Sequence, residues 1–483
     1  MKVAVVGAGW AGLAAAVALR EAGHQTVVLE AAHTPGGRAR RVDRAGFCAP
    51  LDNGQHILLG AYGETLDLMR RVGCQPERLL RRLPLDLRSL DGSFRLHAPK
   101  LPAPLHAAAA LLGARGLGLR ARWAALRLMA ALRAARWRTL PGDTVGGLLQ
   151  RHAQPASVQR LLWEPLCLAA LNTPAPQADA QLFAHVLRDS LTGTRAASDL
   201  LLPSTDLSAL WPDAAAAFCG IRYGTTVRQV VPVHGGDGGD GVHGVHGGHG
   251  GHGGRGVHGG HGGHGGHHGT PAVDIDGERF DAAILAVAPA VAARLLPPPQ
   301  AQPDWRAALE TFSYAPIATL TLALAGPWRL PSPMLMLHED AAAGAHGQWV
   351  FDRAALAGAA GRGEVAIVTS VATALADSPR DAVIASLTQQ LRDQATAGGL
   401  PPMPEVVQAA LLIDKRATFL ATPGLRRPDN ATPWPGIAVA GDWTNTGYPG
   451  VLEGAVRSGR RAAALIMASC AAARTTAHGG SAD

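Results

Sequence analysis

The sequence predicts an α/β protein in which a parallel sheet flanked by helices is joined to a second domain of mixed helix and strand. Two patterns lead to this class: strand, glycine-rich turn, helix and strand follow one another at the N-terminus, and a further strand–turn–helix unit occurs near the C-terminus. The length of 483 residues suffices for two domains or more. With 47% hydrophobic and 17% charged residues, the composition excludes a disordered or fibrous protein.

The N-terminal unit has the form of a dinucleotide-binding turn. Residues 2–6 (KVAVV) are typical of a buried parallel strand, and an Ala/Leu-rich helix follows to about Ala22. Between them, Gly7 allows the tight turn, Gly9 lets the backbone approach a pyrophosphate, and Gly12 lets the helix pack on the strand. The N-terminus of the helix favours negative charge. The unit therefore predicts a bound dinucleotide.

The second strand, residues 25–29, leads into Glu30, which lies 18 residues after Gly12. A carboxylate at this place accepts hydrogen bonds from ribose hydroxyls and repels a 2′-phosphate, which argues against NADP. Two other GxGxxG matches lie within residues 234–269, but neither follows a strand or opens a helix. They are attributed to composition.

Residues 234–269 contain 20 glycines and 10 histidines among 36 residues. Such a segment cannot bury a core, and we expect a disordered surface insertion. Because residues 226–233 and 272–275 both read as strands, the insertion is interpreted as an enlarged hairpin loop. Metal sequestration by the imidazoles is the alternative. Elsewhere no metal site is predicted, and the five scattered cysteines indicate no disulfide framework.

Two further motifs indicate which dinucleotide is bound. Residues 35–38 read PGGR, and residues 438–459 combine AVAGDWTN with GYPGVLEGAVRSG. In the second motif Asp442 can bind hydroxyls, and a helix starting near Val451 directs its N-terminal amides at negative charge. Together with the glycine turn, these motifs resemble the flavoprotein family of amine oxidases and phytoene desaturases.

The resemblance implies FAD as cofactor and an amine oxidase-like architecture: a Rossmann-like FAD-binding domain with a discontinuous, mixed α+β substrate domain. The FAD-binding domain is expected to comprise residues 1–95, 206–300 and 412–483, and the substrate-binding domain residues 96–205 and 301–411. By this resemblance Arg38 lies by the pyrophosphate and the backbone of Val227 meets the adenine. The residues expected to bind FAD are Gly7, Gly9, Gly12, Glu30, Gly36, Gly37, Arg38, Val227, Gly441, Asp442, Gly450, Val451 and Leu452.

Within this superfamily the chain most resembles the hydroxysqualene dehydroxylases, through residues 51–62 (LDNGQHILLGAY) and 163–174 (WEPLCLAALNTP). The resemblance implies reduction of hydroxysqualene to squalene in squalene and hopanoid biosynthesis, with loss of water and with reduced FAD as hydride donor. No second dinucleotide fingerprint is found, so an external electron donor is expected. A desaturase or amine oxidase and a non-enzymatic prenyl-lipid carrier remain as alternatives.

A long isoprenoid substrate requires an apolar cavity, and the alternating residues 317–324 suit a sheet that floors one. Residues 92–142 contain nine basic and no acidic residues, a pattern that favours an anionic membrane over nucleic acid. Treated as one helix, residues 105–140 place Leu119, Trp123, Leu126 and Trp137 on one side. We expect a cytoplasmic protein in peripheral contact with the membrane; an ordinary core-facing helix is the alternative.

Dehydroxylation also requires a proton for the departing hydroxyl. Asp52 and His56 are the candidate donors, because they follow the GGR motif on a segment that in this superfamily passes close to the flavin. The alternative is that both residues only hold the FAD-binding loop.

Overall fold

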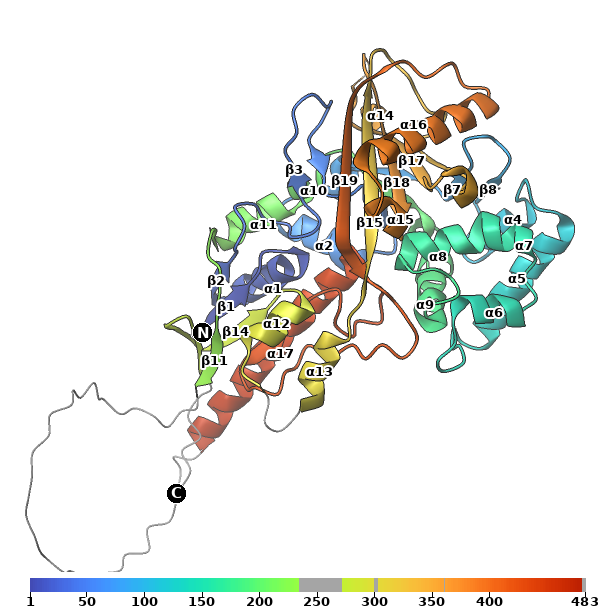
Figure 1. Cartoon of the computed structure of the whole chain (residues 1–483). Coiled ribbons are helices and arrows are strands. Elements are labelled where there is room, and N and C mark those ends of the chain that lie inside the picture. Colours follow the sequence, from blue (N-terminus) through green and yellow to red (C-terminus); the bar gives the residue numbers. More distant parts are fainter. Residues whose placement is uncertain (234–271, 299–302, 360, 480–483) are drawn as a thin grey trace, which may run out of the picture.

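A computed structural model describes residues 1–233, 272–298, 303–359 and 361–479, without the side chains of residues 303 and 471–479. The predicted insertion at 234–269 lies outside the described residues. Figure 1 shows α1 (Trp10–Glu21) and the parallel sheet on one side of the molecule and a group of helices on the other.

The parallel sheet is the base of the predicted dinucleotide-binding unit. Its strand order is β10 (Ile221–Arg222), β2 (Gln25–Leu29), β1 (Lys2–Val6), β14 (Ala282–Leu285) and β20 (Ile437–Val439). All neighbouring pairs are parallel, which confirms the α/β class. The five strands come from the three segments assigned to the FAD-binding domain.

Successive residues of β1 pack alternately into two hydrophobic cores, one on each face of the parallel sheet. Val3 and Val5 pack with α1 and with α17 (Leu452–Gly479), whereas Ala4 and Val6 belong to the core on the opposite face. The helices α1 and α17 approach closely at Gly459, where a Cβ atom would lie 2.0 Å from the carbonyl oxygen of Ala11. This contact joins the N-terminal and C-terminal motifs.

On the opposite face lies a small antiparallel sheet of β11 (Val230–Val233), β12 (Ala272–Ile275) and β13 (Glu278–Phe280). Val233 pairs with Ala272, so the strands flanking the insertion form the expected hairpin. The expectation that the first strand begins at residue 226 is wrong, because the backbone amides of Arg228 and Gln229 donate to the side chain of Asp276 instead of a strand.

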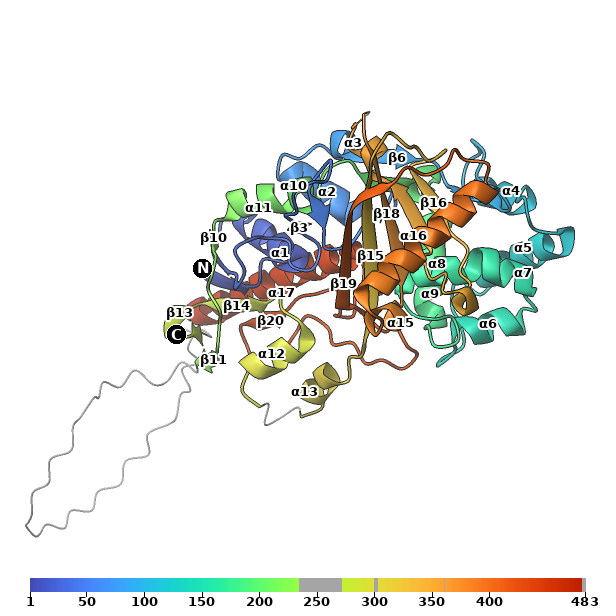
Figure 2. The ribbon, with the colours of Figure 1, turned by 45° about the horizontal axis from the view of Figure 1, so that its top comes forward.

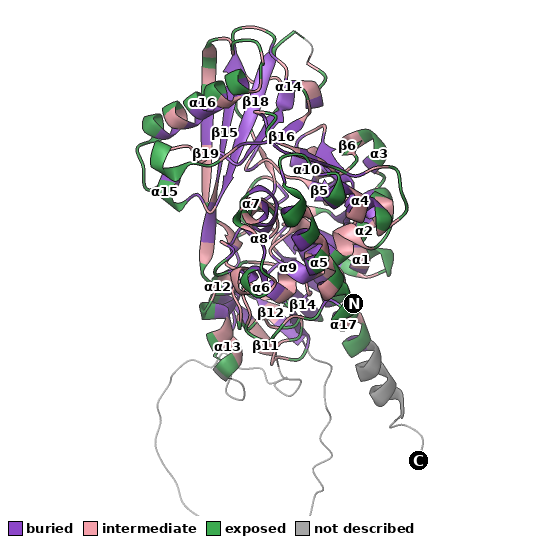
Figure 3. Ribbon diagram, turned by 90° about the vertical axis from the view of Figure 1, so that its right-hand side faces the viewer, coloured by how far each residue is buried: buried purple, intermediate pink, exposed green. Residues whose placement is uncertain are grey.

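A second large sheet is antiparallel, with the order β16 (Met334–Met336), β17 (Trp349–Asp352), β18 (Gly363–Ser370), β15 (Tyr314–Leu324) and β19 (Val406–Phe419). The predicted strand at 317–324 lies in β15. Helix α16 (Arg380–Ala397) lies across this sheet (Figure 2). Figure 3 shows β15 and β18 largely buried and the outer side of α16 exposed. Strand β19 crosses the predicted domain boundary at residue 412, because one continuous strand pairs along the whole length of β15.

Helices form most of the far end of the molecule. They are α4 (Leu105–Leu112), α5 (Leu119–Ala134), α6 (Val145–Arg151), α7 (Ala156–Val158), the π-helical turn η1 (Gln159–Trp163), α8 (Glu164–Leu171) and α9 (Ala180–Leu191).

The single helix predicted for residues 105–140 is wrong. The chain breaks between α4 and α5 at Gly116, which has a positive φ of 83° and whose Cβ would lie 2.2 Å from Ser93 O. After α5 ends, Trp137 adopts a positive φ of 61° and turns into the core, whereas Trp123 stays exposed. The predicted one-sided stripe therefore does not include Trp137.

Smaller elements connect the two large sheets. The short strands are β3 (Arg41–Val42), β4 (Leu51–Asp52), β5 (Leu58–Leu59), β6 (Leu80–Leu83), β7 (Asp86–Arg88), β8 (Arg95–His97) and β9 (Leu200–Pro203). The remaining helices are α2 (Gly63–Arg71), α3 (Pro76–Leu79), α10 (Leu207–Leu210), α11 (Pro212–Cys219), α12 (Pro289–Leu295), α13 (Pro303–Glu310), α14 (Arg353–Leu356) and α15 (Thr373–Ala376), with 3-10 turns at Arg195–Ser198 and Ala341–Ala343. Among the described residues, no helix combines the length and apolar character needed to span a bilayer.

Candidate active site

The glycine turn after β1 has the geometry expected of a pyrophosphate cradle. Gly7 has a φ of 102°, and a Cβ on Gly12 would lie 1.9 Å from Gly7 O, so the fold itself requires both glycines. At Gly9, in contrast, a Cβ would meet only the Cα of Gly37, at 3.8 Å. Internal packing does not require glycine at this position, whereas close approach of a pyrophosphate to the backbone does.

Glu30 lies directly after β2, at the carboxyl end of the parallel sheet. Its Oε2 accepts from the amide of Ala8 at 2.6 Å, and its Oε1 accepts from the amide of Ala32 at 2.8 Å. Each oxygen keeps a further lone pair for a ribose hydroxyl. Val227 is buried, and within the described part of the chain neither its N–H nor its C=O has a hydrogen-bond partner, which leaves both available to an adenine.

Arg38 and Asp442 join the motifs from the two ends of the chain. The Arg38 guanidinium donates to Asp442 Oδ1 at 2.6 Å and to Ala417 O at 2.8 Å, and the amide of Gly36 donates to Ala8 O. The Asp442 carboxylate raises the pKa of Arg38 further above its ordinary value. Because the Arg38 side chain is still 47% exposed, its remaining N–H groups can bind a phosphate. The residues present therefore fit FAD.

The segment between Asp442 and α17 is held by Arg427, a residue that the sequence did not indicate. Its guanidinium donates to the carbonyl oxygens of Asp442 at 2.8 Å and Tyr448 at 2.5 Å, and burial lowers its pKa to about 10. The amide of Gly441 donates to Ser458 Oγ on α17 at 2.9 Å. Leu452 then begins the helix, so Gly450 and Val451 lie at its N-terminal end, as expected.

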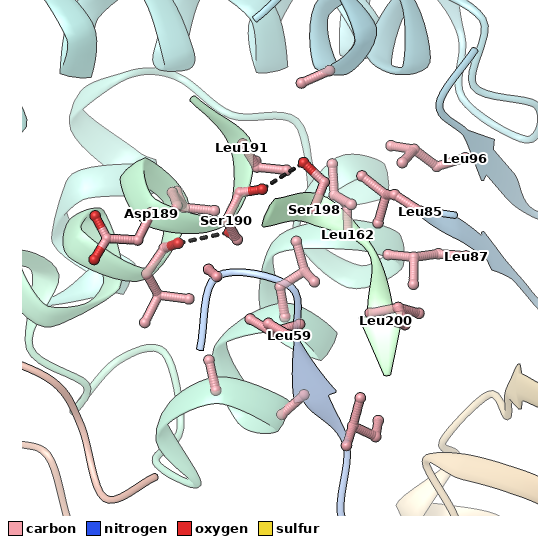
Figure 4. A pocket seen from close by; sticks show the side chains of 18 of the residues that line it. Leu59, Leu85, Leu87, Leu96, Leu162, Asp189, Ser190, Leu191, Ser198 and Leu200 are labelled. Carbon is pink, nitrogen blue, oxygen red and sulfur yellow. Dashed lines mark hydrogen bonds between the residues drawn. The ribbon is translucent and has the colours of Figure 1, made fainter. Parts of the chain in front are cut away.

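An apolar cavity of about 1310 Å³, including its open mouth, lies beside this segment (Figure 4). The residues that line it come from the short strands β5, β7, β8 and β9 and their neighbours, the helical end of the molecule, the large antiparallel sheet and the loop before α17: Ile57, Leu59, Ala61, Tyr62, Leu85, Leu87, Leu96, Ala107, Ala110, Leu111, Met129, Leu162, Trp163, Leu166, Ala169, Ala170, Phe183, Val186, Leu187, Asp189, Ser190, Leu191, Ser198, Leu200, Met334, Trp349, Tyr448 and Val451.

Both motifs that carry the closer resemblance contribute to this wall. Residues 51–62 supply Ile57 to Tyr62 at intervals, and residues 163–174 supply Trp163 and three residues of α8. Trp163 ends the π-helical turn, and its indole N–H donates to Gln154 Oε1 at 2.9 Å. Insertions of this kind in helices occur frequently at functional sites.

The two predicted proton donors lie outside this wall. Asp52 is buried in β4, and its Oδ1 accepts from the amide of Leu207 at 2.8 Å. His56 Nδ1 lies 2.6 Å from Gly54 O, and burial lowers its pKa. The described residues lining the cavity include neither side chain, which favours the alternative that both hold the loop.

Two polar residues of the cavity wall were not assigned from the sequence. The hydroxyl of Tyr448, within the C-terminal motif, donates to Asp189 Oδ2 on α9 at 2.6 Å. No spacing relates these residues, which lie 259 positions apart. The signal in the sequence was a tyrosine four residues before Leu452, the first residue of the helix expected to face the cofactor.

Comparison with known proteins agrees with this geometry. The family model described as flavin containing amine oxidoreductase matches residues 10–467. The chain belongs to this family. Hydroxysqualene dehydroxylases match along almost the full length: that of Rhodopseudomonas palustris is 30% identical over 487 residues, covering 96% of this chain and 98% of the relative, and that of Sinorhizobium fredii is 28% identical with the same coverage.

Solved structures share the fold. An oxidoreductase from Methanosarcina mazei superposes with a TM-score of 0.66 at 16% identity, covering 95% of this chain and 99% of that structure. Wild-type putrescine oxidase bound to putrescine gives 0.65 at 18% identity, with 97% and 99% covered. The fold prediction is confirmed, and the chain is an FAD-dependent oxidoreductase of the hydroxysqualene dehydroxylase group. The non-enzymatic carrier interpretation is set aside.

Proposed function

We propose that the enzyme reduces hydroxysqualene to squalene, with the hydroxyl lost as water. The observation that carries the proposal is the cavity with its leucine-rich apolar wall, which extends to Tyr448 and Val451 beside the start of α17. Further support comes from three hydroxysqualene dehydroxylases that match 96% of the chain. A C30 isoprenoid alcohol fits such a wall, because its chain is apolar and its one hydroxyl requires few polar partners.

FAD, when bound in its fully reduced form, would supply the hydride for the allylic carbon and, in the overall balance, the proton with which the hydroxyl leaves as water. The chain contributes by holding the cofactor through Glu30, Arg38 and Asp442, by excluding water with the leucine-rich wall, and by aligning the substrate in the cavity. Since the sequence has one dinucleotide fingerprint, the electrons come from an external donor.

Desaturation of a polyprenyl substrate is the alternative chemistry. Its support is weaker, since the zeta-carotene desaturase of Arabidopsis thaliana is 31% identical over only 23% of this chain. The deciding experiment is anaerobic incubation of the purified enzyme with chemically reduced FAD and hydroxysqualene, followed by product identification. Squalene is expected with enzyme and not in the enzyme-free control. A desaturated product formed with oxidised FAD, and no squalene with reduced FAD, would contradict the proposal.

We further propose that α4 and α5 dock on the inner face of the cytoplasmic membrane. The docking surface is defined as the exposed apolar residues Leu105, Leu112, Leu119 and Trp123. Around it lie exposed basic residues, within a segment of the sequence that has no acidic residue. Helix α4 supports a role in substrate entry, because its other side lines the cavity through Ala107, Ala110 and Leu111.

A further inference from the structure

The cavity wall carries few polar side chains, and they differ in what they offer a ligand. Ser190 Oγ donates to Val186 O at 2.6 Å, and Ser198 Oγ lies between Ser190 O, at 2.5 Å, and His106 Nε2, at 2.7 Å. Their protons are thus directed into the protein. Asp189 brings a carboxylate to the cavity wall, and the hydroxyl of Tyr448 donates to it there. In Figure 4, Asp189 lies at one end of the labelled side chains, away from Leu85, Leu87 and Leu96.

This pair is fixed from several sides. Arg188 Nε donates to Asp189 Oδ1 at 2.6 Å. One turn earlier on α9, His185 Nδ1 lies 3.2 Å from Gly447 O, and the guanidinium of Arg457 lies 4.6 Å from the centre of the Tyr448 ring. With the Arg427 bond to the Tyr448 carbonyl, these contacts set the geometry before a ligand arrives.

The protonation of the pair determines what it can bind. Burial alone would raise the pKa of Asp189, but hydrogen bonds from Arg188 and Tyr448 outweigh it and hold that pKa below its ordinary value. Burial and the bond to Asp189 raise the pKa of Tyr448, so the phenol stays neutral. Its one proton is directed at the carboxylate, and the lone pairs of its oxygen are left to accept a hydrogen bond.

We propose that Tyr448 and Asp189 form a hydroxyl-binding subsite that accepts the O–H of a long-chain isoprenoid alcohol at the cofactor end of the cavity. The substrate class rests on the function proposed above. Val451, which is expected to face FAD, lines the same end. A hydrocarbon offers no O–H to the pair, so the subsite discriminates against it. The dehydroxylated product is therefore held less tightly than the alcohol, which favours its release.

The test is the ratio of the dissociation constants for an alcohol and its matching hydrocarbon. Holoenzyme with oxidised FAD is titrated anaerobically with hydroxysqualene or squalene, and separately with farnesol or farnesene, following the flavin absorbance and tryptophan fluorescence. Tyr448→Phe is expected to weaken alcohol binding about tenfold and to leave hydrocarbon binding unchanged, because it removes only the hydroxyl. Tyr223→Phe, at an exposed tyrosine outside the cavity wall, is the matched control and is expected to change neither.

An equal loss for alcohol and hydrocarbon, or no loss for either, would overturn the subsite and leave the pair as a structural tie between α9 and the loop. FAD content and the thermal midpoint of each variant show whether it folds. If Tyr448→Phe does not, Asp189→Asn is judged by the same ratio. The proposed function is tested separately by wild-type turnover: failure to form squalene, together with a farnesol preference that Tyr448→Phe abolishes, would contradict that function and retain the subsite.

Discussion

At the residue scale, Gly9 and Gly12 of the N-terminal turn are needed for different reasons, and alanine substitutions can distinguish them. An alanine at Gly12 would place its Cβ 1.9 Å from a backbone oxygen, whereas an alanine at Gly9 meets only ordinary contact distances. Gly12→Ala is expected to destabilise the fold by at least about 1–3 kcal/mol, through overpacking. Gly9→Ala is expected to keep the thermal midpoint of the apoprotein but to lose FAD, because the added methyl group prevents the pyrophosphate from approaching the backbone.

The two variants serve as controls for each other, and the measurements are thermal unfolding of apoprotein and the ratio of flavin to protein absorbance after reconstitution. A Gly9→Ala protein that retains FAD as well as the wild type would contradict the assignment of this turn.

Asp52 provides a prediction on pH. Burial raises its pKa from an ordinary value of 3.8 to about 7, so the folded protein keeps this proton at a pH where the unfolded chain has lost it. Stability from Asp52 is therefore present below about pH 4 and is lost as the pH rises toward 7, by up to about 4 kcal/mol at 1.36 kcal/mol per pKa unit.

Asp52→Asn should remove this dependence while keeping an acceptor for the Leu207 amide. The thermal midpoint of the variant, relative to wild type, is expected to rise between pH 4 and 7 and then level off. Asp43→Asn, at an exposed carboxylate near the same strands, is the control and should leave the pH profile unchanged. A constant difference between Asp52→Asn and wild type across this range would show that Asp52 is ionised throughout.

Sequence could predict those site residues whose roles follow from local pattern. Gly7, Gly12 and Glu30 are related by short spacings that a strand–turn–helix unit fixes, and the structure brings them together with Arg38 and Asp442. Other residues act through contacts between distant segments. Arg427 donates to backbone carbonyl oxygens. Because every residue has such an oxygen, no residue type in the sequence identifies its partners.

At the scale of elements, the docking surface gives a test of membrane association. Replacing Leu119 and Trp123 by serine in one variant is expected to weaken binding to anionic vesicles by on the order of tenfold or more, because apolar area no longer leaves water. The matched control replaces Val407 and Phe218 by serine. Both residues are also exposed but lie on β19 and α11. Sedimentation with vesicles at low and high salt measures the vesicle binding of both variants. Equal binding of the two variants would contradict docking through α4 and α5.

The same elements show where periodicity fails as a predictor. Residues 105–140 are rich in alanine, leucine and arginine, but Gly113, Gly116 and Gly118 interrupt the pattern between α4 and α5. The turn at Gly116 packs against Ser93, a contact from outside the segment that periodicity does not reveal. Trp137 is similarly turned inward by its positive φ, which its neighbours Arg136 and Arg138 do not reveal.

The alternating pattern of residues 317–324 correctly predicted a strand, because these residues pair on both sides in β15. The prediction that they floor the cavity is wrong: among the described residues, this sheet reaches the cavity through Met334 on β16 and Trp349 on β17.

At the scale of the whole molecule, the cavity forms where discontinuous segments meet. Its wall includes residues from β5, α4, α8, α9, β16 and the loop before α17, which come from both predicted domains. The sequence predicted that such a cavity exists, from the substrate class of the resembling family, but its position depends on long-range packing. The boundary predicted at residue 412 falls within β19 for the same reason, because the pairing of this strand with β15 depends on long-range contacts.

Because β11 and β12 form a hairpin, the fold is expected to tolerate deletion of the His/Gly-rich insertion between them. Val233 and Ala272 are directly paired across β11 and β12, so residues 234–271 can be replaced by Asn-Gly, the turn that matches the twist of paired strands. A shorter loop reduces the entropy that the chain loses when its two ends are brought together. The shortened enzyme is therefore expected to retain its FAD content and squalene formation, with an unchanged or higher thermal midpoint. Loss of zinc or nickel binding, with activity intact, would support metal sequestration by the insertion; loss of FAD or activity would contradict its interpretation as an enlarged loop.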